Sequence, residues 1–261
     1  ETHNMFTMGD VARCSLGGPQ DFYNEEMLYR LFGVNAELLI DHAWGWEPCT
    51  IAAIKDYRPK SSSLSSGQVL PEPYPHEKAR LIVREMADQL SLELVEKGLV
   101  CSQFVLDIGY DAENLSAPAQ QRSYHGLTKT DRYGRAVPAA AHGSANLSVP
   151  ASSARILMQT AAEVFDHIAD SRLSVRRVTV TAAGLLRQEE AQLVGGDQLD
   201  FFGNYAAHQQ QKAELERELS GQQAIVALRQ KYGKNAVLRG MDLQEGATTK
   251  NRNGQIGGHK A

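Results

Sequence analysis

The chain has 261 residues, of which 42% are hydrophobic, and a formal net charge of −4. This length and hydrophobic content are enough for one large folded domain, or for two small domains and a tail. No run of residues approaches the roughly 18 consecutive apolar positions of a membrane-spanning helix, so we expect no membrane partner. The acidic balance excludes a protein that binds nucleic acid over its whole surface, and any such site must be a local patch.

The three cysteines, Cys14, Cys49 and Cys101, are odd in number and widely spaced. They form no Cys-x-x-Cys pair and have no set of histidine ligands nearby. We therefore interpret them as small hydrophobic residues of a reduced, cytoplasmic protein, and we expect no metal site. The chain begins with Glu1 and has no signal-peptide pattern, so we expect that it starts inside a longer gene product.

Charge is distributed unevenly along the chain. Residues 1–59 carry 4 basic and 9 acidic side chains, residues 60–190 carry 14 and 15, and residues 191–261 carry 9 and 7. The best candidate for a local cationic patch is the stretch 120–142, where a single acid stands among four cations: Asp131 against Arg122, Lys129, Arg132 and Arg135. We expect any contact with nucleic acid to use this patch.

Two short helices joined by a tight turn are predicted in the first sixty residues. Asn24 can cap the first helix and Gly33 ends it, and Asn35 begins the second. This outline is typical of a helix-hairpin-helix, whose turn amides from Gly33 to Asn35 can bind a DNA phosphate. An ordinary helical hairpin has the same outline, and the turn sequence Gly-Val-Asn differs from the usual Gly-x-Gly.

Residues 58–66 have the composition of a linker, Arg-Pro-Lys followed by five serines and one leucine, so we expect a domain boundary near residue 60. Beyond it, Pro71, Pro73 and Pro75 are expected to break a first strand. The order of strands and helices over 62–187 is then β-α-β-β-α-β: strands at 64–70, 103–110, 141–149 and about 177–182, and helices at about 76–97 and 153–168. This order predicts an α+β fold, a four-stranded antiparallel sheet with both helices on one side.

The sheet face without helices is predicted to be polar. Two alternating rows supply it, one from the third strand and one from the fourth: His142, Ser144 and Asn146, and Arg177, Thr179 and Thr181. Hydroxyl, amide and cationic donors suit the phosphate oxygens of a nucleic-acid backbone. A solvated sheet face that binds nothing is the alternative.

The chain after residue 190 contains a Gly-containing joint, the pentapeptide Gln-Leu-Asp-Phe-Phe at 198–202, and a polar helix predicted over 205–232 that Gly233 ends. The last twenty or so residues are rich in Gly, Asn, Thr and Lys and have no periodicity. We expect this tail to be flexible, or ordered only by a partner.

Several separated blocks of the sequence resemble the thumb and little-finger parts of Y-family DNA polymerases. The blocks are residues 6–12, 31–33, 41–45, 65–68, 77–94 and 142–147, and they occur in the order that the family has. The chain is most similar to a bacterial branch related to DNA polymerase IV, including the endings at 245–249 and 255–260. The resemblance implies a thumb-like helical part at 1–60, a little-finger DNA-binding domain at 61–190, and a clamp-binding motif, polar helix and flexible tail at 191–261.

In this family the palm lies N-terminal to the thumb and holds the acidic residues that bind two Mg²⁺ ions. No such motif is present here. The paired acids Glu25-Glu26 and Glu189-Glu190 are interpreted as solvated charge, so we expect no catalytic residue and no cofactor in this chain. The parent protein is expected to be a Mg²⁺-dependent DNA-directed DNA polymerase, and this part is expected to be inactive alone.

The resemblance implies contacts with the DNA backbone that do not read the bases. Transferred position by position, phosphate contacts are expected on two strands, at Ser65, Ser66, Gln68, Ser144 and Asn146. His142 lies in the same row, and Arg132, Arg135 and Arg177 are expected as nearby cations. The turn at Gly33 and Asn35 is a further candidate.

The pentapeptide Gln198, Leu199, Asp200, Phe201 and Phe202 looks like the bacterial sliding-clamp motif Gln-Leu-x-Leu-Phe, with Phe201 where leucine is commoner. Its glutamine can hydrogen-bond a polar pocket wall, while the leucine and two aromatic rings fill an apolar groove. The alternative is a short strand or staple packed on the little finger.

The expected function is therefore that of the DNA-binding C-terminal portion of an error-prone translesion polymerase. It grips the primer-template and docks on the sliding clamp during repair of DNA damage, as a monomer in the cytoplasm at the nucleoid. A stand-alone, non-enzymatic DNA-binding or interaction protein with a little-finger fold is the alternative. An RNA-binding β-α-β-β-α-β module is a third, disfavoured because the central strands lack base-stacking aromatic pairs.

Overall fold

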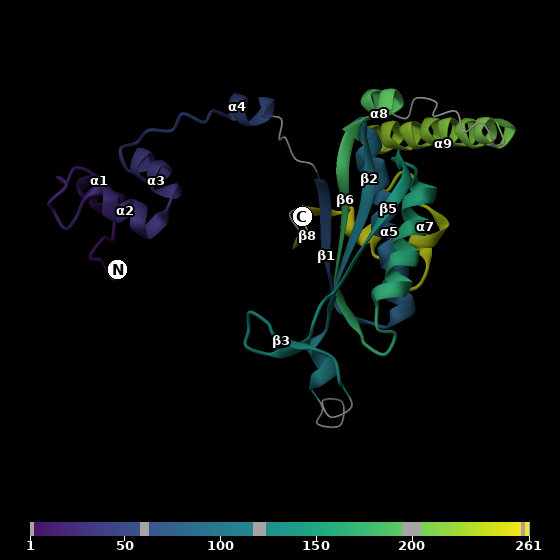
Figure 1. The fold of residues 1–261 in the computed structure, drawn as a ribbon, viewed down its shortest axis with the longest axis horizontal. Coiled ribbons are helices and arrows are strands. Elements are labelled where there is room, and N and C mark those ends of the chain that lie inside the picture. Colours follow the sequence, from purple (N-terminus) through teal and green to yellow (C-terminus); the bar gives the residue numbers. More distant parts are fainter. Residues whose placement is uncertain (1–2, 58–62, 117–123, 195–204, 257–258, 261) are drawn as a thin grey trace. The chain divides into compact units, whose positions relative to one another are not determined.

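The computed structural model describes five stretches of the chain: residues 3–57, 63–116, 124–194, 205–256 and 259–260 (Figure 1). The chain divides into two compact units, one at 1–60 and one at 61–261. None of the helices in these stretches combines the length and the apolar character needed to cross a membrane.

The first unit consists of four short helices: α1 (Met8–Ser15), α2 (Glu25–Phe32), α3 (Asn35–Ala43) and α4 (Ile51–Asp56). The Asn24 side chain accepts a hydrogen bond from the Met27 amide at 2.9 Å, and Gly33 ends α2 with a φ of 58°. A positive φ is strained for other residues, which explains the glycine at this turn. The two helices predicted in this region are confirmed.

The core of the first unit is small. Its cluster of contacting buried side chains comes from α1, α2 and α3: Val11, Cys14, Leu28 and Ala36. Ala12 and Met27 are buried beside it. No residue of α4 is buried. Three short helices around so small a cluster bury little apolar surface, so this unit gains only modest stability from its own packing.

The second unit is built on a four-stranded sheet. Its strands are β1 (Ser63–Tyr74), β2 (Leu99–Tyr110), β5 (Ala141–Ala151) and β6 (Val175–Arg187), in the spatial order β1-β6-β2-β5. All neighbouring strands are antiparallel. Helices α5 (His76–Glu96) and α7 (Ala154–Ile168) pack on one face of the sheet (Figure 1). The predicted α+β fold is confirmed.

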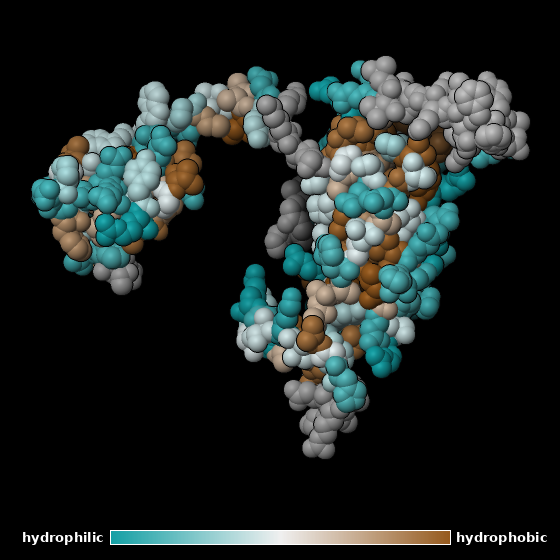
Figure 2. All heavy atoms as spheres, viewed as in Figure 1, coloured by the Kyte–Doolittle hydropathy of each residue, from teal (hydrophilic) through white to brown (hydrophobic). Residues whose placement is uncertain are grey.

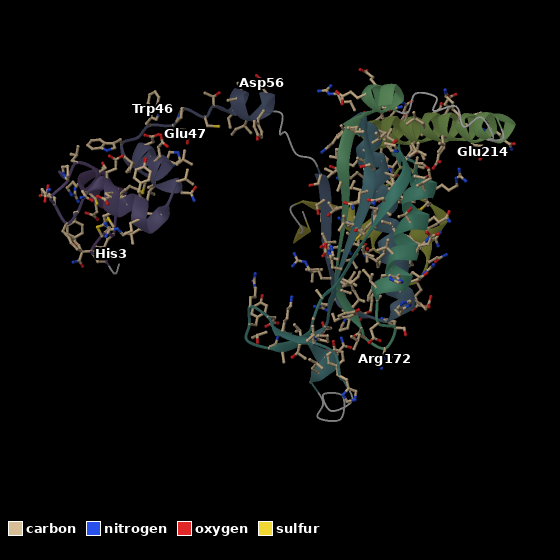
Figure 3. The ribbon with its side chains drawn as sticks, in the orientation of Figure 1. His3, Trp46, Glu47, Asp56, Arg172 and Glu214 are labelled. Atoms are coloured by element: carbon tan, nitrogen blue, oxygen red, sulfur yellow. The ribbon has the colours of Figure 1, made fainter. Side chains whose placement is uncertain are left out.

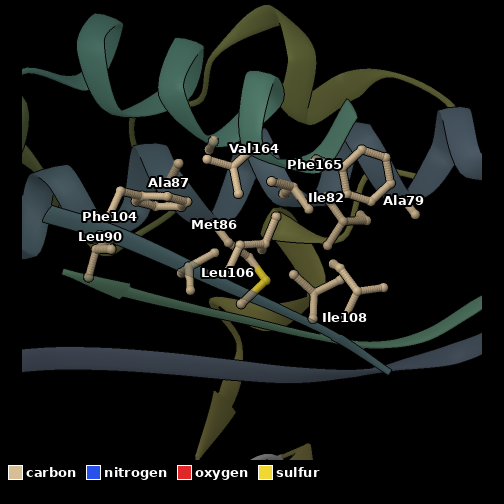
Figure 4. Packing of buried hydrophobic residues seen from close by; sticks show 14 of the residues in the cluster. Ala79, Ile82, Met86, Ala87, Leu90, Phe104, Leu106, Ile108, Val164 and Phe165 are labelled. Carbon is tan, nitrogen blue, oxygen red and sulfur yellow. The ribbon is translucent and has the colours of Figure 1, made fainter. Parts of the chain in front are cut away.

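The main core lies between the sheet and these two helices. Alternate residues of β2, such as Phe104 and Leu106, contact the apolar side of α5 around Met86, and Phe165 of α7 closes the layer (Figure 4). All four side chains are at most 1% exposed. Burial of each side chain of this size contributes about 1.5–3 kcal/mol, so this layer supplies most of the unit's stability.

The prediction that prolines break the first strand is wrong in its position. Strand β1 continues through Pro71 and Pro73 to Tyr74, and Pro75 is the residue that precedes α5. Regular pairing with β6 stops at Val69 and resumes only at Tyr74. A proline nitrogen has no hydrogen to donate. Because β1 is an edge strand and this stretch is irregular, no hydrogen bond between strands is lost at these prolines.

A small hairpin projects from the end of the sheet, between β2 and β5. It consists of β3 (Thr128–Thr130) and β4 (Ala136–Pro138), and β4 contacts the 3-10 turn η1 (Ala112–Leu115) (Figure 1). Sequence reasoning missed this hairpin. Strands of three mostly exposed residues have no buried face, and without one there is no period-two pattern to detect.

Two helices follow the sheet, α8 (Gln188–Val194) and α9 (Tyr205–Tyr232). The bounds predicted for the polar helix, 205–232, are confirmed. Helix α9 packs on α5, with Gln222 buried and donating to Ser91 at 3.2 Å. Outside this contact, Glu214 of α9, labelled in Figure 3, forms an ion pair with Arg155 of α7, with 3.8 Å between Oε2 and Nη2.

The C-terminal tail is docked, and the expectation of a flexible tail is corrected for residues 239–256. This part contains η2 (Gly240–Leu243), α10 (Thr249–Arg252) and β7 (Gln255–Ile256), which pairs with β8 (His259–Lys260).

Two buried carboxylates of α5 hold the tail. Arg239 Nε donates to Asp88 at 2.6 Å, and the Thr248 amide donates to Glu85 at 2.9 Å. Glu85 and Asp88 are each only 2% exposed, and burial raises the pKa of both. The composition of the tail could not reveal this, because its partners lie on a core helix 151 or more residues away.

Replacing Arg239 with alanine is expected to lower the free energy of unfolding by about 3 kcal/mol, because it leaves the buried Asp88 carboxylate without its cation. Urea unfolding followed by circular dichroism measures the change. The matched control is Lys212→Ala on the exposed side of α9, which is expected to change the value by less than about 0.5 kcal/mol. Equal values for the two variants would contradict a stabilising role for the Arg239–Asp88 pair.

Candidate functional site

The sheet face opposite α5 and α7 is open and polar. Strand register aligns its residues in three rows of four, which together we call the open face: Ser63, Ala183, Gln103 and Asn146; Ser65, Thr181, Val105 and Ser144; Gly67, Thr179, Asp107 and His142. The positions on the two edge strands are exposed, and those on the two central strands are partly buried. The predicted polar rows of β5 and β6 therefore do share one face.

Hydrogen bonds across the strands organise the open face. Thr181 Oγ1 donates to Ser65 Oγ at 2.9 Å, and Gln103 Nε2 donates to Asn146 Oδ1 at 3.0 Å. These contacts fix the side-chain rotamers of a shallow surface made of hydroxyl and amide groups. Each group keeps unused hydrogen-bonding capacity, which an outside ligand can take up.

Asp107 is the one carboxylate in the three rows of the open face. Its Oδ1 lies 2.7 Å from His142 Nδ1 on the neighbouring strand, and both side chains are about half exposed or more, at 49% and 64%. Sequence reasoning assigned His142 to this face but missed Asp107. An imidazole can carry a positive charge, so this pairing reduces the repulsion between Asp107 and an anionic ligand.

Arg177 supplies a cation at the end of the open face. It lies opposite Gly109, and a Cβ added to that glycine would lie 3.1 Å from Arg177 Cβ. The missing side chain leaves room for the arginine beside β2. The guanidinium is exposed and forms no ion pair with any residue that the structure describes.

The predicted residues Ser66 and Gln68 do not lie on the open face. They alternate with Ser65 and Gly67 along β1 and therefore point to the helix side of the sheet. Gln68 Nε2 donates to Thr248 Oγ1 at 2.9 Å, and Arg252 donates to Ser66 Oγ at 2.5 Å. The docked tail occupies both side chains, so the structure separates them from Ser65, Ser144 and Asn146.

The remaining predicted cations, Arg132 and Arg135, lie in the β3–β4 turn. Asp131 binds Arg135 through its Nε at 2.8 Å and its Nη2 at 2.7 Å, which neutralises much of that charge. Lys129 on β3 is exposed and has no ion-pair partner within the described stretches. Arg172, near the same end of the sheet, is paired with Asp170 at 2.7 Å (Figure 3).

The other predicted residues belong elsewhere. Gly33 and Asn35 lie in the first unit, where α3 begins without a side-chain cap. The Gly33 amide donates to Tyr29 O at 2.8 Å and the Ala36 amide to Gly33 O at 3.0 Å. The pentapeptide Gln198, Leu199, Asp200, Phe201 and Phe202 lies outside the described residues. It stands in the chain between α8, which contacts β6 and β2, and α9, which contacts α5.

In the described stretches, no three His, Cys, Asp or Glu side chains lie close enough together to hold a metal ion. The three cysteines are free thiols, with Cys14 and Cys101 buried and Cys49 exposed. Burial raises the pKa of Cys101 to about 11, so this thiol is an inert core group at neutral pH.

Residues 61–197 match the C-terminal domain of the impB/mucB/samB family, which is more than half of the chain. The chain belongs to this family. The matched region covers the sheet, its two helices and the hairpin, and it is the C-terminal domain of Y-family polymerases. A comparison with curated proteins found no match.

Gly143 allows strand β5 of the open face to pack closely on helix α7. It stands between His142 and Ser144 on β5 but faces α7, where an added Cβ would lie 2.6 Å from Ile168 Cγ2 and 3.2 Å from Val164 Cγ1. Neither branched side chain can move away without shifting α7. A glycine is therefore required for this close packing of helix on strand.

Replacing Gly143 with alanine is expected to lower the free energy of unfolding by about 1–3 kcal/mol, because the new methyl group overpacks the contact with α7. Thermal and urea unfolding measure the change. Gly221→Ala is the matched control: Gly221 lies in α9 with nothing within 4 Å of an added Cβ, so alanine should stabilise by about 0.5–1 kcal/mol. The opposite order of the two variants would sink this account.

Proposed function

We propose that this chain is the DNA-binding C-terminal portion of a translesion polymerase from the branch related to DNA polymerase IV. The observation that carries the proposal is the open face, a shallow surface of hydroxyl, amide and cationic groups in a chain that belongs to this family. The parent enzyme, in this proposal, carries the palm and its two Mg²⁺ ions elsewhere. No residue of this chain is assigned to catalysis or to metal.

The chemistry of the open face supports contact with the sugar-phosphate backbone. Serine, threonine and asparagine donors bind phosphate oxygens in any sequence. The three rows contain no Phe, Tyr or Trp ring that would stack on a base and no arginine fork aimed at base edges. Affinity that does not depend on an intact base is what a polymerase working on damaged DNA requires.

The proposed contacts are those residues that the structure places together. Ser65 and Thr181 on one side, Ser144 and Asn146 on the other, and Arg177 at the end form one surface. Arg132 and Arg135 extend it onto the hairpin, and His142 lies beside Asp107 in the same surface, with 2.7 Å between Nδ1 and Oδ1. The turn from Gly33 to Asn35 is a separate proposed contact of the first unit, through the Asn35 amide, because the Gly33 amide donates to Tyr29 O at 2.8 Å.

Replacing Arg177 with alanine is expected to weaken binding to a short DNA duplex roughly tenfold at low salt, since one charge-assisted hydrogen bond contributes about 1.5 kcal/mol. It should also reduce the slope of log affinity against log salt by about one. Fluorescence anisotropy over a salt series measures both. Lys212→Ala on α9 removes the same charge from the helix layer and should leave both unchanged.

One outcome of this experiment favours the alternative function, that of an interaction protein that does not bind DNA. If the intact chain binds neither duplex nor primer-template at low salt, the open face is a solvated surface. The chain is then better explained as an interaction protein with a little-finger fold. If Arg177→Ala and Lys212→Ala weaken binding equally, DNA binds through general charge rather than through the open face.

We further propose that the pentapeptide at 198–202 docks on the bacterial sliding clamp. A glutamine followed by apolar and aromatic residues fits a groove with one polar wall. Its neighbours in the chain, α8 and α9, both pack on the second unit, so docking would tether the DNA-binding surface directly to the clamp. Tethering raises the effective concentration of the polymerase at the primer end. The protein would then act in the cytoplasm, at the nucleoid.

The double replacement Phe201→Ala and Phe202→Ala is expected to abolish binding of the chain to its host's sliding clamp. The wild-type chain should bind with a dissociation constant in the micromolar range, about −8 kcal/mol. Isothermal titration calorimetry measures the difference. Asp200→Ala, at the variable position of the motif, is the matched control and should retain binding. Wild-type binding that survives the double replacement would mean that another surface contacts the clamp.

A further inference from the structure

The tip of the β3–β4 hairpin carries an aromatic ring in an unusual position. Tyr133 is 68% exposed, and the next most exposed Tyr, Phe or Trp in the described part of the second unit is Tyr232 on α9, at 64%. Leu127, near the base of the hairpin, is 81% exposed. Single exposed side chains of this kind are common on protein surfaces, so the case for a ligand depends on the groups around the ring.

Two arginines flank this ring. The Cζ atom of Arg132 lies 4.8 Å from the ring centroid of Tyr133, and that of Arg135 lies 5.3 Å away. Arg132 Nη2 also donates to the tyrosine hydroxyl at 2.9 Å. Hydrophilic side chains gather on this hairpin (Figure 2). The tip therefore brings together the aromatic ring of Tyr133 and the planar guanidinium groups of Arg132 and Arg135.

The turn is organised before any ligand arrives. Asp131 Oδ1 accepts hydrogen bonds from the Tyr133 amide at 2.8 Å and the Arg135 amide at 2.9 Å, and Gly134 adopts a φ of 79°. The bond from the Arg135 amide is the main reason that the pKa of Asp131 is lowered, so the carboxylate stays charged. A ligand that binds here does not need to order the backbone first.

We propose that the hairpin tip binds an unpaired nucleotide of the DNA strand. Its base stacks on Tyr133 or on a flanking guanidinium, and its phosphate contacts Arg132 and Lys129. Aromatic rings with arginine beside them bind single-stranded nucleic acid in this way, whatever the base. Base pairs inside a duplex have both faces covered by their neighbours, so stacking selects the unpaired part of a strand.

The position of the hairpin fits this role and rests on the proposed function. Strand β5 begins at Ala141, three residues after β4 ends, so the hairpin continues the chain from the end of the open face that carries His142. In Figure 1 the hairpin extends beyond the end of the sheet. A template strand held on the open face would pass the hairpin where it leaves the duplex.

Binding to two DNAs tests the inference: a blunt duplex, and the same duplex with a short unpaired 5′ extension. The wild-type chain should prefer the extended DNA by roughly fivefold or more, which is the lower end of one stacked base. Tyr133→Ala should remove this preference and leave affinity for the blunt duplex unchanged. Tyr133→Phe should keep the preference, because the ring face remains, and Tyr232→Ala is the control for loss of an exposed tyrosine.

A second readout reports stacking directly. With 2-aminopurine at the first unpaired position, the wild-type chain should change its fluorescence on binding, and Tyr133→Ala should not. Equal affinity of wild type and Tyr133→Ala for the extended DNA, with unfolding curves that coincide, overturns the inference while the proposed function stands. Failure of the wild-type chain to bind either DNA overturns both.

Discussion

The second unit depends on one constraint, the burial of a single face of its sheet. Phe104 and Leu106 of β2, with Val178 and Val180 of β6, are all 0% exposed beneath α5 and α7. Because successive side chains of a strand point to opposite faces, this buried set forces the intervening residues onto the other side. Ser65, Thr181, Ser144 and Asn146 share a surface for that reason. The candidate DNA-binding face is thus a direct consequence of the core.

Helix α5 links the core to the rest of the unit. One side of it carries Ile82, Met86 and Leu90 toward the sheet, while Glu85 and Asp88 face the docked tail. Buried carboxylates are costly unless they are paired, so the tail and the helix must form together. This contact also engages Ser66 and Gln68, and it leaves the open face as the sheet surface that a ligand can reach.

The local distribution of charge is compatible with the proposed DNA binding, although the net charge of the chain is −4. Many of its charges cancel locally: Asp131 holds Arg135, Asp170 holds Arg172, and Asp107 faces His142. Arg177, Lys129 and Arg132 are left without an acid partner in the described stretches, at one end of the sheet and on the hairpin. For the proposed function, a few cations on a polar face predict weak, salt-sensitive binding that does not depend on sequence.

The sequence by itself determined the four strands of the sheet, its main helices and the fold class, because helix caps, 3.6-residue periodicity and strand alternation are local properties. Asn24 and Gly33 delimit α2, the range 205–232 forms α9, and the row of His142, Ser144 and Asn146 faces away from the core. Only the tertiary structure decided which polar residues stay available. Ser65 faces outward while Gln68 bonds to Thr248, 180 residues away. Pairing over such distances depends on register and packing, and no local pattern encodes it.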